Sequence, residues 1–169
     1  SDHWRGENGQ RYVQILKKAL AVLDYSRENV EYLTSQFGLK PLRINWGYDP
    51  SFEANDAKSK QTDRDIDVYF VGGMSQRRKM IIENIRRSRP NWKIVAHHKI
   101  DVETHRNEIA RSKVVLNLHK LSDPAILETA RLTSLLSNGA LVISEKGMSD
   151  ITNQEYAAYV LFCNTPPAQ

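Results

Sequence analysis

The segment "IDVYFVGGMSQRRKM", residues 66–80, joins an apolar run to two adjacent glycines and then to a basic stretch. Residues 66–71 have the length and continuity of a buried strand, and the basic stretch begins a helix that we predict over residues 77–89. Gly72 and Gly73 stand at the junction, where glycine adopts backbone angles closed to other residues and lets a ligand approach the main chain. The segment therefore indicates a strand, a tight turn and a helix that starts at the turn.

Elements of the same kind are expected as far as residue 144. Strands are predicted over residues 92–97, 113–119 and 140–144, with helices over residues 102–110 and up to Asn138 between them. Continuous apolar strands that alternate with helices are typical of a parallel sheet covered by helices on both faces. The expected fold class is therefore α/β, a Rossmann-like doubly wound parallel sheet, preceded by a partial β-α-β segment.

The N-terminal residues indicate this β-α-β segment. Apolar residues at helical spacing predict a helix over residues 9–20, which leads into a short buried strand. A second helix is expected over residues 27–37, with Ser26 as its N-cap and Gly38 at its C-terminal end. Residues 41–50 then indicate a strand and a turn.

A change of composition separates the two parts. Residues 51–65 contain many small or charged side chains and no periodic apolar ones, which is typical of a linker. We therefore expect a partial unit over residues 1–50, a linker over residues 51–65 and a Rossmann-like domain over residues 66–169.

Composition and charge narrow the classes of function. The apolar runs are far shorter than the roughly 20 residues that span a bilayer, so we expect a soluble, cytoplasmic protein without a membrane span. The single cysteine, Cys163, excludes an intrachain disulfide and a cysteine zinc site. The net charge of +4 favours anionic partners mildly, and it fits a nucleotide or phosphate better than a nucleic acid, which we rank as an unlikely partner.

Ligands of open parallel sheets bind outside the carboxyl ends of the strands. This rule selects the segments 72–78, 97–99, 117–120 and 144–147 as places for the chemistry. The first of them combines glycines with Arg77 and Arg78, whose forked guanidinium groups match phosphate oxygens, but it lacks the spacing of a dinucleotide or P-loop motif. A phosphate cradle and a plain turn before a solvated basic helix therefore stay open as interpretations.

Glu128 and Arg131 are predicted to share one face of a helix, because they are three residues apart. A carboxylate can accept hydrogen bonds from ribose hydroxyls, and an arginine beside it can bind phosphate. An exposed salt bridge between the two side chains is the simpler alternative, and spacing alone favours it. The next strand places Glu145 at its carboxyl end, at the same edge of the sheet.

Five segments together resemble a known family. They are "AVLDYSRENVEYL" (21–33), "INWGYDP" (44–50), "VYFVGGMSQRRKMI" (68–81), "SKVVLNLHK" (112–120) and "ETARLTSLLSNGALVISE" (128–145). This set is similar to glycosyltransferases of the GT-B type, in particular the spore-protein CgeB-like group. The resemblance implies that residues 66–169 form the domain that binds a nucleotide-sugar donor. It also implies that residues 1–50 are the C-terminal remnant of an acceptor-side Rossmann-like domain.

The resemblance further implies which residues bind the donor and its phosphates: Gly72, Gly73, Arg77, Arg78, His119, Lys120, Glu128, Arg131 and Glu145. Many GT-B relatives place a ribose-binding glutamate five residues before the glycine that ends the motif helix, where this chain has Ser134. Ribose binding then falls to Glu128 or Glu145. No residue of the chain is assigned as a catalytic base.

The implied reaction is transfer of a sugar from a nucleoside-diphosphate sugar to an unknown acceptor, which can be a glycan, a lipid or a protein. Backbone amides and Arg or Lys charges are expected to stabilise the leaving diphosphate, so neither a metal nor another cofactor is expected. The alternative function is a non-catalytic Rossmann-like module that binds a nucleotide or another protein.

Overall fold

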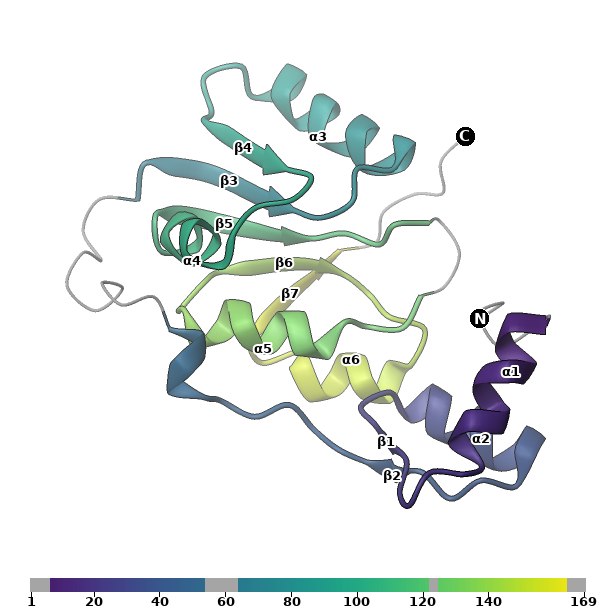
Figure 1. The fold of residues 1–169 in the computed structure, drawn as a ribbon. Coiled ribbons are helices and arrows are strands. Elements are labelled where there is room, and N and C mark those ends of the chain that lie inside the picture. The colour runs from purple at the N-terminus through teal and green to yellow at the C-terminus, as the bar shows by residue number, and fades with distance from the viewer. Residues whose placement is uncertain (1–6, 54–63, 122–124, 164–169) are drawn as a thin grey trace.

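A computed structural model describes residues 7–53, 64–121 and 125–163 of the 169-residue chain, and it confirms the Rossmann-like α/β fold (Figure 1). Five parallel strands form one sheet in the order β4-β3-β5-β6-β7. The strands are β3 (Ile66–Val71), β4 (Ile94–His97), β5 (Ser112–Asn117), β6 (Val142–Glu145) and β7 (Val160–Cys163). The chain reverses its direction of travel across the sheet after β4, so the carboxyl ends of β3 and β5 flank the switch point where such sheets bind ligands.

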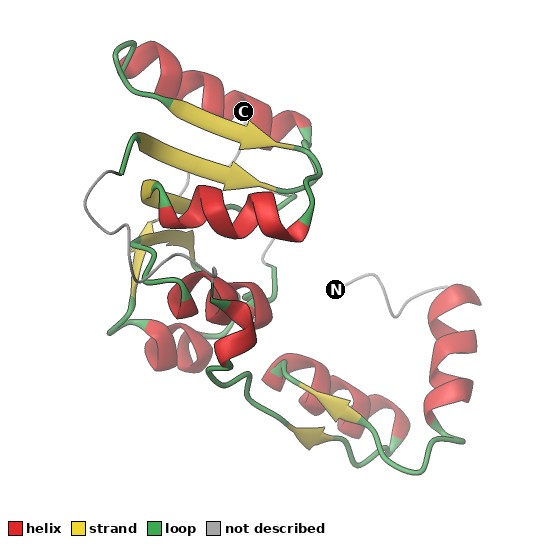
Figure 2. Ribbon diagram, turned by 60° about the vertical axis from the view of Figure 1, so that its left-hand side comes forward, coloured by secondary structure: helices red, strands yellow, loops and turns green. Residues whose placement is uncertain are grey.

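Helices cover both faces of this sheet, as the turned view in Figure 2 shows. They are α3 (Gln76–Ser88), α4 (Val102–Ala110), α5 (Thr129–Ser137) and α6 (Asp150–Tyr156). One apolar cluster contains residues of α4 and α5, and the other contains residues of α3. Tyr69 and Phe70 are both 0% exposed and belong to different clusters. Adjacent residues on a strand point to opposite faces, which explains why β3 is apolar without a break from Val68 to Val71.

The N-terminal unit contains α1 (Glu7–Leu16), β1 (Leu23–Asp24), α2 (Arg27–Phe37), β2 (Leu42–Arg43) and the short 3-10 helix η2 (Pro50–Phe52). Strands β1 and β2 pair in parallel around α2, so the predicted β-α-β segment is confirmed. Helix α2 has the predicted bounds because both caps form. The Ser26 hydroxyl accepts from the Asn29 amide, and Gly38 adopts a left-handed φ of 64° and donates to Leu33 and Thr34.

Two predictions about the N-terminal unit were wrong. Helix α1 ends at Leu16 and not at residue 20, because the bonds of Lys18 and Ala19 reach back only three residues, to Ile15 and Leu16. The strand that follows is not buried, since Leu23 is 57% exposed. A sheet of two strands has no further strand to shield it, and this explains the exposure.

Polar contacts join the N-terminal unit to the larger sheet domain. Arg43 of β2 makes two hydrogen bonds, of 3.0 and 2.6 Å, to the carboxylate of Glu155 on α6. After η2 the chain enters residues 54–63, so most of the predicted linker lies outside the described residues. The division of the chain into domains at residues 51–65 stays a prediction.

Candidate anion-binding site

Gly72 lies at the carboxyl end of β3 between two guanidinium groups. A side chain at this position would have its Cβ 3.3 Å from Nη1 of Arg78 and 3.5 Å from Nη1 of Arg131. Both guanidinium groups also lie over the Phe70 ring, at 5.3 and 5.5 Å from its centroid. The φ of Gly72 is +148°, a backbone angle that side-chain-bearing residues rarely adopt. Glycine therefore brings the main chain close to two positive charges.

Arg78 belongs to the first turn of α3 and is 6% exposed. Its Nη1 donates to the Gly73 carbonyl at 2.8 Å, and its Nε and Nη2 donate to the Leu118 carbonyl at 3.1 and 2.5 Å. The helix starts here because the Ser75 side chain accepts from the Arg78 amide as N-cap. The carbonyl bonds fix the guanidinium beside Gly72 and leave its charge without a carboxylate partner among the described residues.

Arg131 reaches the same place from α5, and its Nη2 donates to the Val71 carbonyl. Burial lowers the pKa of both Arg78 and Arg131, and the like charge of Arg78 lowers the pKa of Arg131 further. Arginine nevertheless stays protonated in proteins. Two partly desolvated cations thus share one small region, which makes it attractive to an anion.

Arg77 has a different role from its neighbour Arg78. Its guanidinium forms a two-point ion pair with Glu145, in which Nη1 lies 2.9 Å from one carboxylate oxygen, and it also donates to the His119 carbonyl at 3.1 Å. The His119 amide donates to the same carboxylate. Glu145 is 4% exposed. Through these bonds the buried pair ties the loops after β5 and β6 to α3. Its two charges neutralise each other.

The remaining predicted site residues lie around the same edge. The His119 ring nitrogen Nε2 is 2.8 Å from the Lys146 carbonyl, which joins the two loops again, and Lys120 beside it is exposed. Near Gly73, Nδ1 of His98 accepts from the Met74 amide at 3.1 Å. The structure therefore brings all the predicted segments to one edge, although whether they bind a ligand stays a prediction.

Glu128 and Arg131 do not form the exposed salt bridge that their spacing allowed. Helix α5 begins at Thr129, so Glu128 is its N-cap residue and lies before the helix, where it makes no side-chain capping bond. Glu128 is exposed, whereas Arg131 points into the protein toward Val71. The carboxylate still acts electrostatically on Arg131 and on Arg78, because it raises the pKa of both.

Sequence reasoning missed a polar cluster on the other side of Arg131. The Tyr69 hydroxyl lies 2.8 Å from Nδ1 of His105, and Nε2 of His97 lies 2.9 Å from the Glu108 carboxylate. Burial and the charge of Glu108 raise the pKa of Tyr69, while burial and the charge of Arg131 lower the pKa of His105. The only signal in the sequence was the three-residue spacing of His105 and Glu108 on a predicted helix.

In the described part of the chain, no group of three or more His, Cys, Asp or Glu side chains is arranged to hold a metal ion. None of the helices in this part combines the length and the apolar character needed to cross a membrane.

Comparison with known proteins supports the fold. No protein-family model matches the sequence, and the search of curated proteins found no match. Among solved structures, the chain is similar to a sucrose-phosphate synthase from Thermosynechococcus elongatus, with a TM-score of 0.57 and 14% sequence identity. The match covers 100% of this chain and 51% of that one, so the chain spans about half the length of the synthase. At this identity the likeness establishes a shared fold.

Proposed function

We propose that this chain is the donor-binding part of a GT-B-type glycosyltransferase, which transfers a sugar from a nucleoside-diphosphate sugar to an acceptor in the cytoplasm. The fold neighbour, a sucrose-phosphate synthase, supports the general kind of reaction. Membership of the CgeB-like group remains part of the proposal and is supported by the five sequence segments alone.

The paired guanidinium groups at Gly72 are the observation that carries the proposal. They lie where β3 ends beside β5, at the switch point where doubly wound sheets bind phosphorylated ligands. A diphosphate placed over Gly72 would contact Arg78 on one side and Arg131 on the other. An arginine fork can bind two phosphate oxygens at once, so the site has the donors for both phosphates.

These two arginines also suit the chemistry of the leaving group. Negative charge develops on the diphosphate as the bond to the sugar breaks, and donors that are already in place stabilise it without reorganisation. Main-chain carbonyls of Val71, Gly73 and Leu118 hold the guanidinium groups in position. In the proposed reaction the two cations supply the charge that a metal ion would otherwise provide.

The backbone amides contribute less to the proposed cradle than the sequence suggested. The Gly72 amide donates to His97 in the sheet, the Met74 amide donates to His98, and the Ser75 amide donates to Gly73. These three amides of the turn are therefore already engaged. Arginine side chains, and not a nest of amides, would hold the diphosphate.

A non-catalytic nucleotide-binding or protein-interaction module is the second candidate function. Helix α5 has Ser134 where the resemblance expects a ribose-binding glutamate, and the Glu145 carboxylate is already paired with Arg77. Of the predicted carboxylates only Glu128 is exposed to accept from a ribose. This arrangement favours weak nucleotide binding and is compatible with a chain that no longer transfers a sugar.

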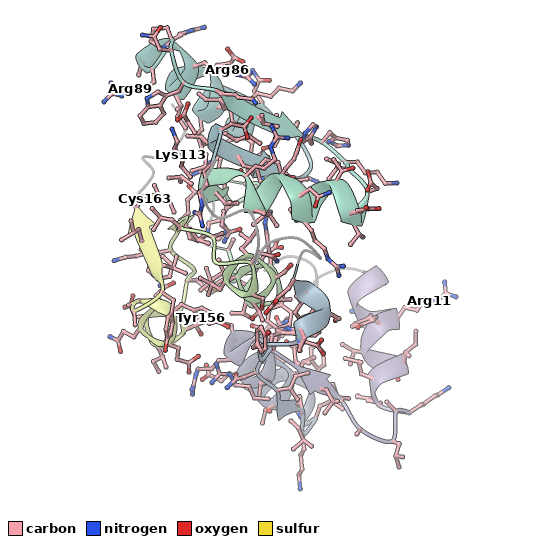
Figure 3. All side chains as sticks on the ribbon, turned by 90° about the vertical axis from the view of Figure 1, so that its left-hand side faces the viewer. Arg11, Arg86, Arg89, Lys113, Tyr156 and Cys163 are labelled. Carbon is pink, nitrogen blue, oxygen red and sulfur yellow. The ribbon has the colours of Figure 1, made fainter. Side chains whose placement is uncertain are left out.

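Calorimetric titration with pyrophosphate, UDP and GDP tests the proposal. We expect binding that weakens as salt is added, and an affinity about tenfold lower in Arg131→Lys, which keeps the charge but loses the fork. Arg86→Ala is the matched control, because Arg86 lies on α3 but pairs with Glu83 in solvent. Figure 3 shows Arg86 pointing outward.

The two candidate functions separate in a second measurement. Release of UDP or GDP from a panel of nucleotide sugars, alone and with acceptor extracts, would support the transferase. Nucleotide binding without any release would favour the non-catalytic module. Absence of binding to all three anions at millimolar concentration would contradict the transferase and a nucleotide-binding module, and would leave a protein-interaction module as the candidate.

A further inference from the structure

Two aromatic side chains stand at the carboxyl ends of the small parallel sheet. Tyr25 directly follows β1, and Trp46 comes three residues after β2. Their ring centroids are 6.4 Å apart with an angle of 55° between the planes. Trp46 is 42% exposed, so an aromatic face is available to a ligand at the end of this second sheet. The rule that parallel sheets bind ligands beyond their carboxyl ends applies here as well.

Helix α5 connects this aromatic pair to the arginine site. The Thr133 hydroxyl donates to the Trp46 carbonyl at 3.4 Å, which fixes the segment after β2 against the helix. Glu128, at the N-terminal end of α5, lies within electrostatic reach of Tyr25 and also of Arg78 and Arg131. Figure 1 shows β1 and β2 beneath α5 and α6, toward the side where the strands of the large sheet end. Glu128 is therefore near enough to act electrostatically on both the aromatic pair and the two arginines.

Charge divides this region into two parts. The pKa of Tyr25 is raised by burial and by three carboxylates, those of Glu128, Asp24 and Glu28. The potential around Tyr25 is thus negative and disfavours a phosphate, whereas the potential around Gly72 is positive and favours one. The potential on the aromatic side thus excludes an anion, and the carboxylate of Glu128 is an acceptor for hydroxyl donors of an uncharged ligand.

A sugar ring meets these conditions. Its C–H faces are apolar and pack flat against aromatic rings, and its hydroxyl groups donate to carboxylates, a combination typical of ligand sites with aromatic walls and few polar groups. We propose that Tyr25, Trp46 and Glu128 form a binding site for an uncharged sugar ring, so that the acceptor of the reaction is a carbohydrate. The role of this sugar as the acceptor rests on the proposed function, whereas the sugar site itself does not.

Saturation-transfer NMR with the methyl glycosides of glucose, galactose and mannose tests the site, with and without UDP. We expect saturation of the ring C–H protons of at least one glycoside in the full chain, and no competition by UDP. Trp46→Ala should weaken this binding about tenfold, while Trp46→Phe should retain most of it because an aromatic face remains. Glu128→Gln should weaken it less, since an amide oxygen still accepts a hydrogen bond.

Trp92→Ala is the matched control. Trp92 is 46% exposed, like Trp46, but it stacks with Arg89 and precedes the amino end of β4, away from the carboxyl ends of the strands, so its loss should change neither sugar nor UDP binding. Circular dichroism confirms that each variant folds. If Trp46→Ala does not fold, Tyr25→Leu serves the same purpose on the other ring.

The outcomes distinguish this inference from the proposed function. UDP binding that depends on Arg131, without saturation of any glycoside, would overturn the sugar site and leave the donor site intact. Sugar saturation that depends on Trp46, without UDP binding, would support the sugar site and count against the transferase. Competition between UDP and the glycoside would overturn the inference, because it would assign the aromatic pair to the nucleobase.

Discussion

Arg78 and Arg131 face each other across Gly72, with their Nη1 atoms 3.3 and 3.5 Å from the point where a side chain at Gly72 would begin. They come from different helices, and each is fixed by a main-chain carbonyl and not by a carboxylate. Their mutual repulsion is therefore retained in the folded protein. An anion between them would relieve it, and this relationship gives rise to the first prediction.

Gly72→Ala should destabilise the fold by about 1–3 kcal/mol, because alanine is strained at a φ of +148°. It should also abolish pyrophosphate binding, since the new methyl group would occupy the space between the guanidinium groups. Denaturant unfolding and calorimetry measure the two effects. Gly139→Ala is the control, because Gly139 has a φ of +64° and open space around its Cβ position. That variant should lose stability but keep pyrophosphate binding, and equal binding losses in both variants would contradict the site.

The second prediction concerns the ion pair of Arg77 and Glu145. Arg77→Ala should cost about 3–5 kcal/mol of unfolding free energy, because a buried carboxylate then loses the positive charge that neutralises it. The double variant Arg77→Met with Glu145→Gln should recover most of this loss, since no charge is then buried. Urea unfolding of the wild-type protein and of the two variants measures these free energies. A loss below about 1 kcal/mol in Arg77→Ala would show that the pair behaves like an exposed salt bridge.

Local signals explain which parts of the fold the sequence predicted. The bounds of α2 were correct because Ser26 and Gly38 mark its two ends, and β3 was correct because most of it is an unbroken apolar run, residues 68–71. Helix α6 and strand β7 were not expected. They have 7 and 4 residues, and β7 is held by pairing with β6 and by the burial of Val160, which is 3% exposed. Such long-range stabilisation leaves little periodicity in a short segment.

The sequence predicted at which edge of the sheet the candidate site residues lie, but it did not predict which contacts they make. The topological rule placed the glycines and arginines at one edge of the sheet, and the structure does so too. The topological rule could not assign partners to Arg77 and Arg78, which are adjacent in sequence but point about 100° apart around a helix. Arg77 pairs with Glu145, 68 residues away, and Arg78 bonds to Leu118, 40 residues away. Only the packed loops decide which arginine keeps an unpaired charge.

The third prediction concerns pH. Burial and the charge of Arg131 lower the pKa of His105 from its usual value, so below about pH 6.5 the unfolded chain binds more protons than the folded one. His105 therefore contributes stability that is present above that pH. This stability is lost as the pH falls toward the lower pKa that His105 has in the folded protein. His105→Asn should flatten this part of the stability curve, because an amide oxygen can accept from Tyr69 without titrating. An unchanged slope between pH 7 and about pH 5 would contradict the prediction.

Anion binding should be linked to the same histidine. A phosphate beside Arg131 neutralises the charge that disfavours the imidazolium form, so pyrophosphate should raise the pKa of His105. NMR titration of the histidine ring protons measures this shift. An unchanged titration of His105 on addition of pyrophosphate would place the bound anion away from Arg131.

The last prediction concerns the attachment of the N-terminal unit. The two hydrogen bonds from Arg43 to Glu155 join β2 to α6, and Arg27 lies 3.8 Å from the same carboxylate. These side chains are partly exposed, so Glu155→Gln should cost less than about 1 kcal/mol of global stability. It should nevertheless speed hydrogen exchange of the Leu42 and Ile44 amides, which hold β2 to β1, because a sheet of two strands depends on what it packs against. Amides of β3 and β5 should exchange at an unchanged rate, since their sheet is covered on both faces. Equal acceleration in both sheets would show that the ion pair stabilises the whole chain. No acceleration in β2 would show that other contacts, such as the hydrogen bond from Thr133 of α5 to the Trp46 carbonyl, are sufficient to hold the unit.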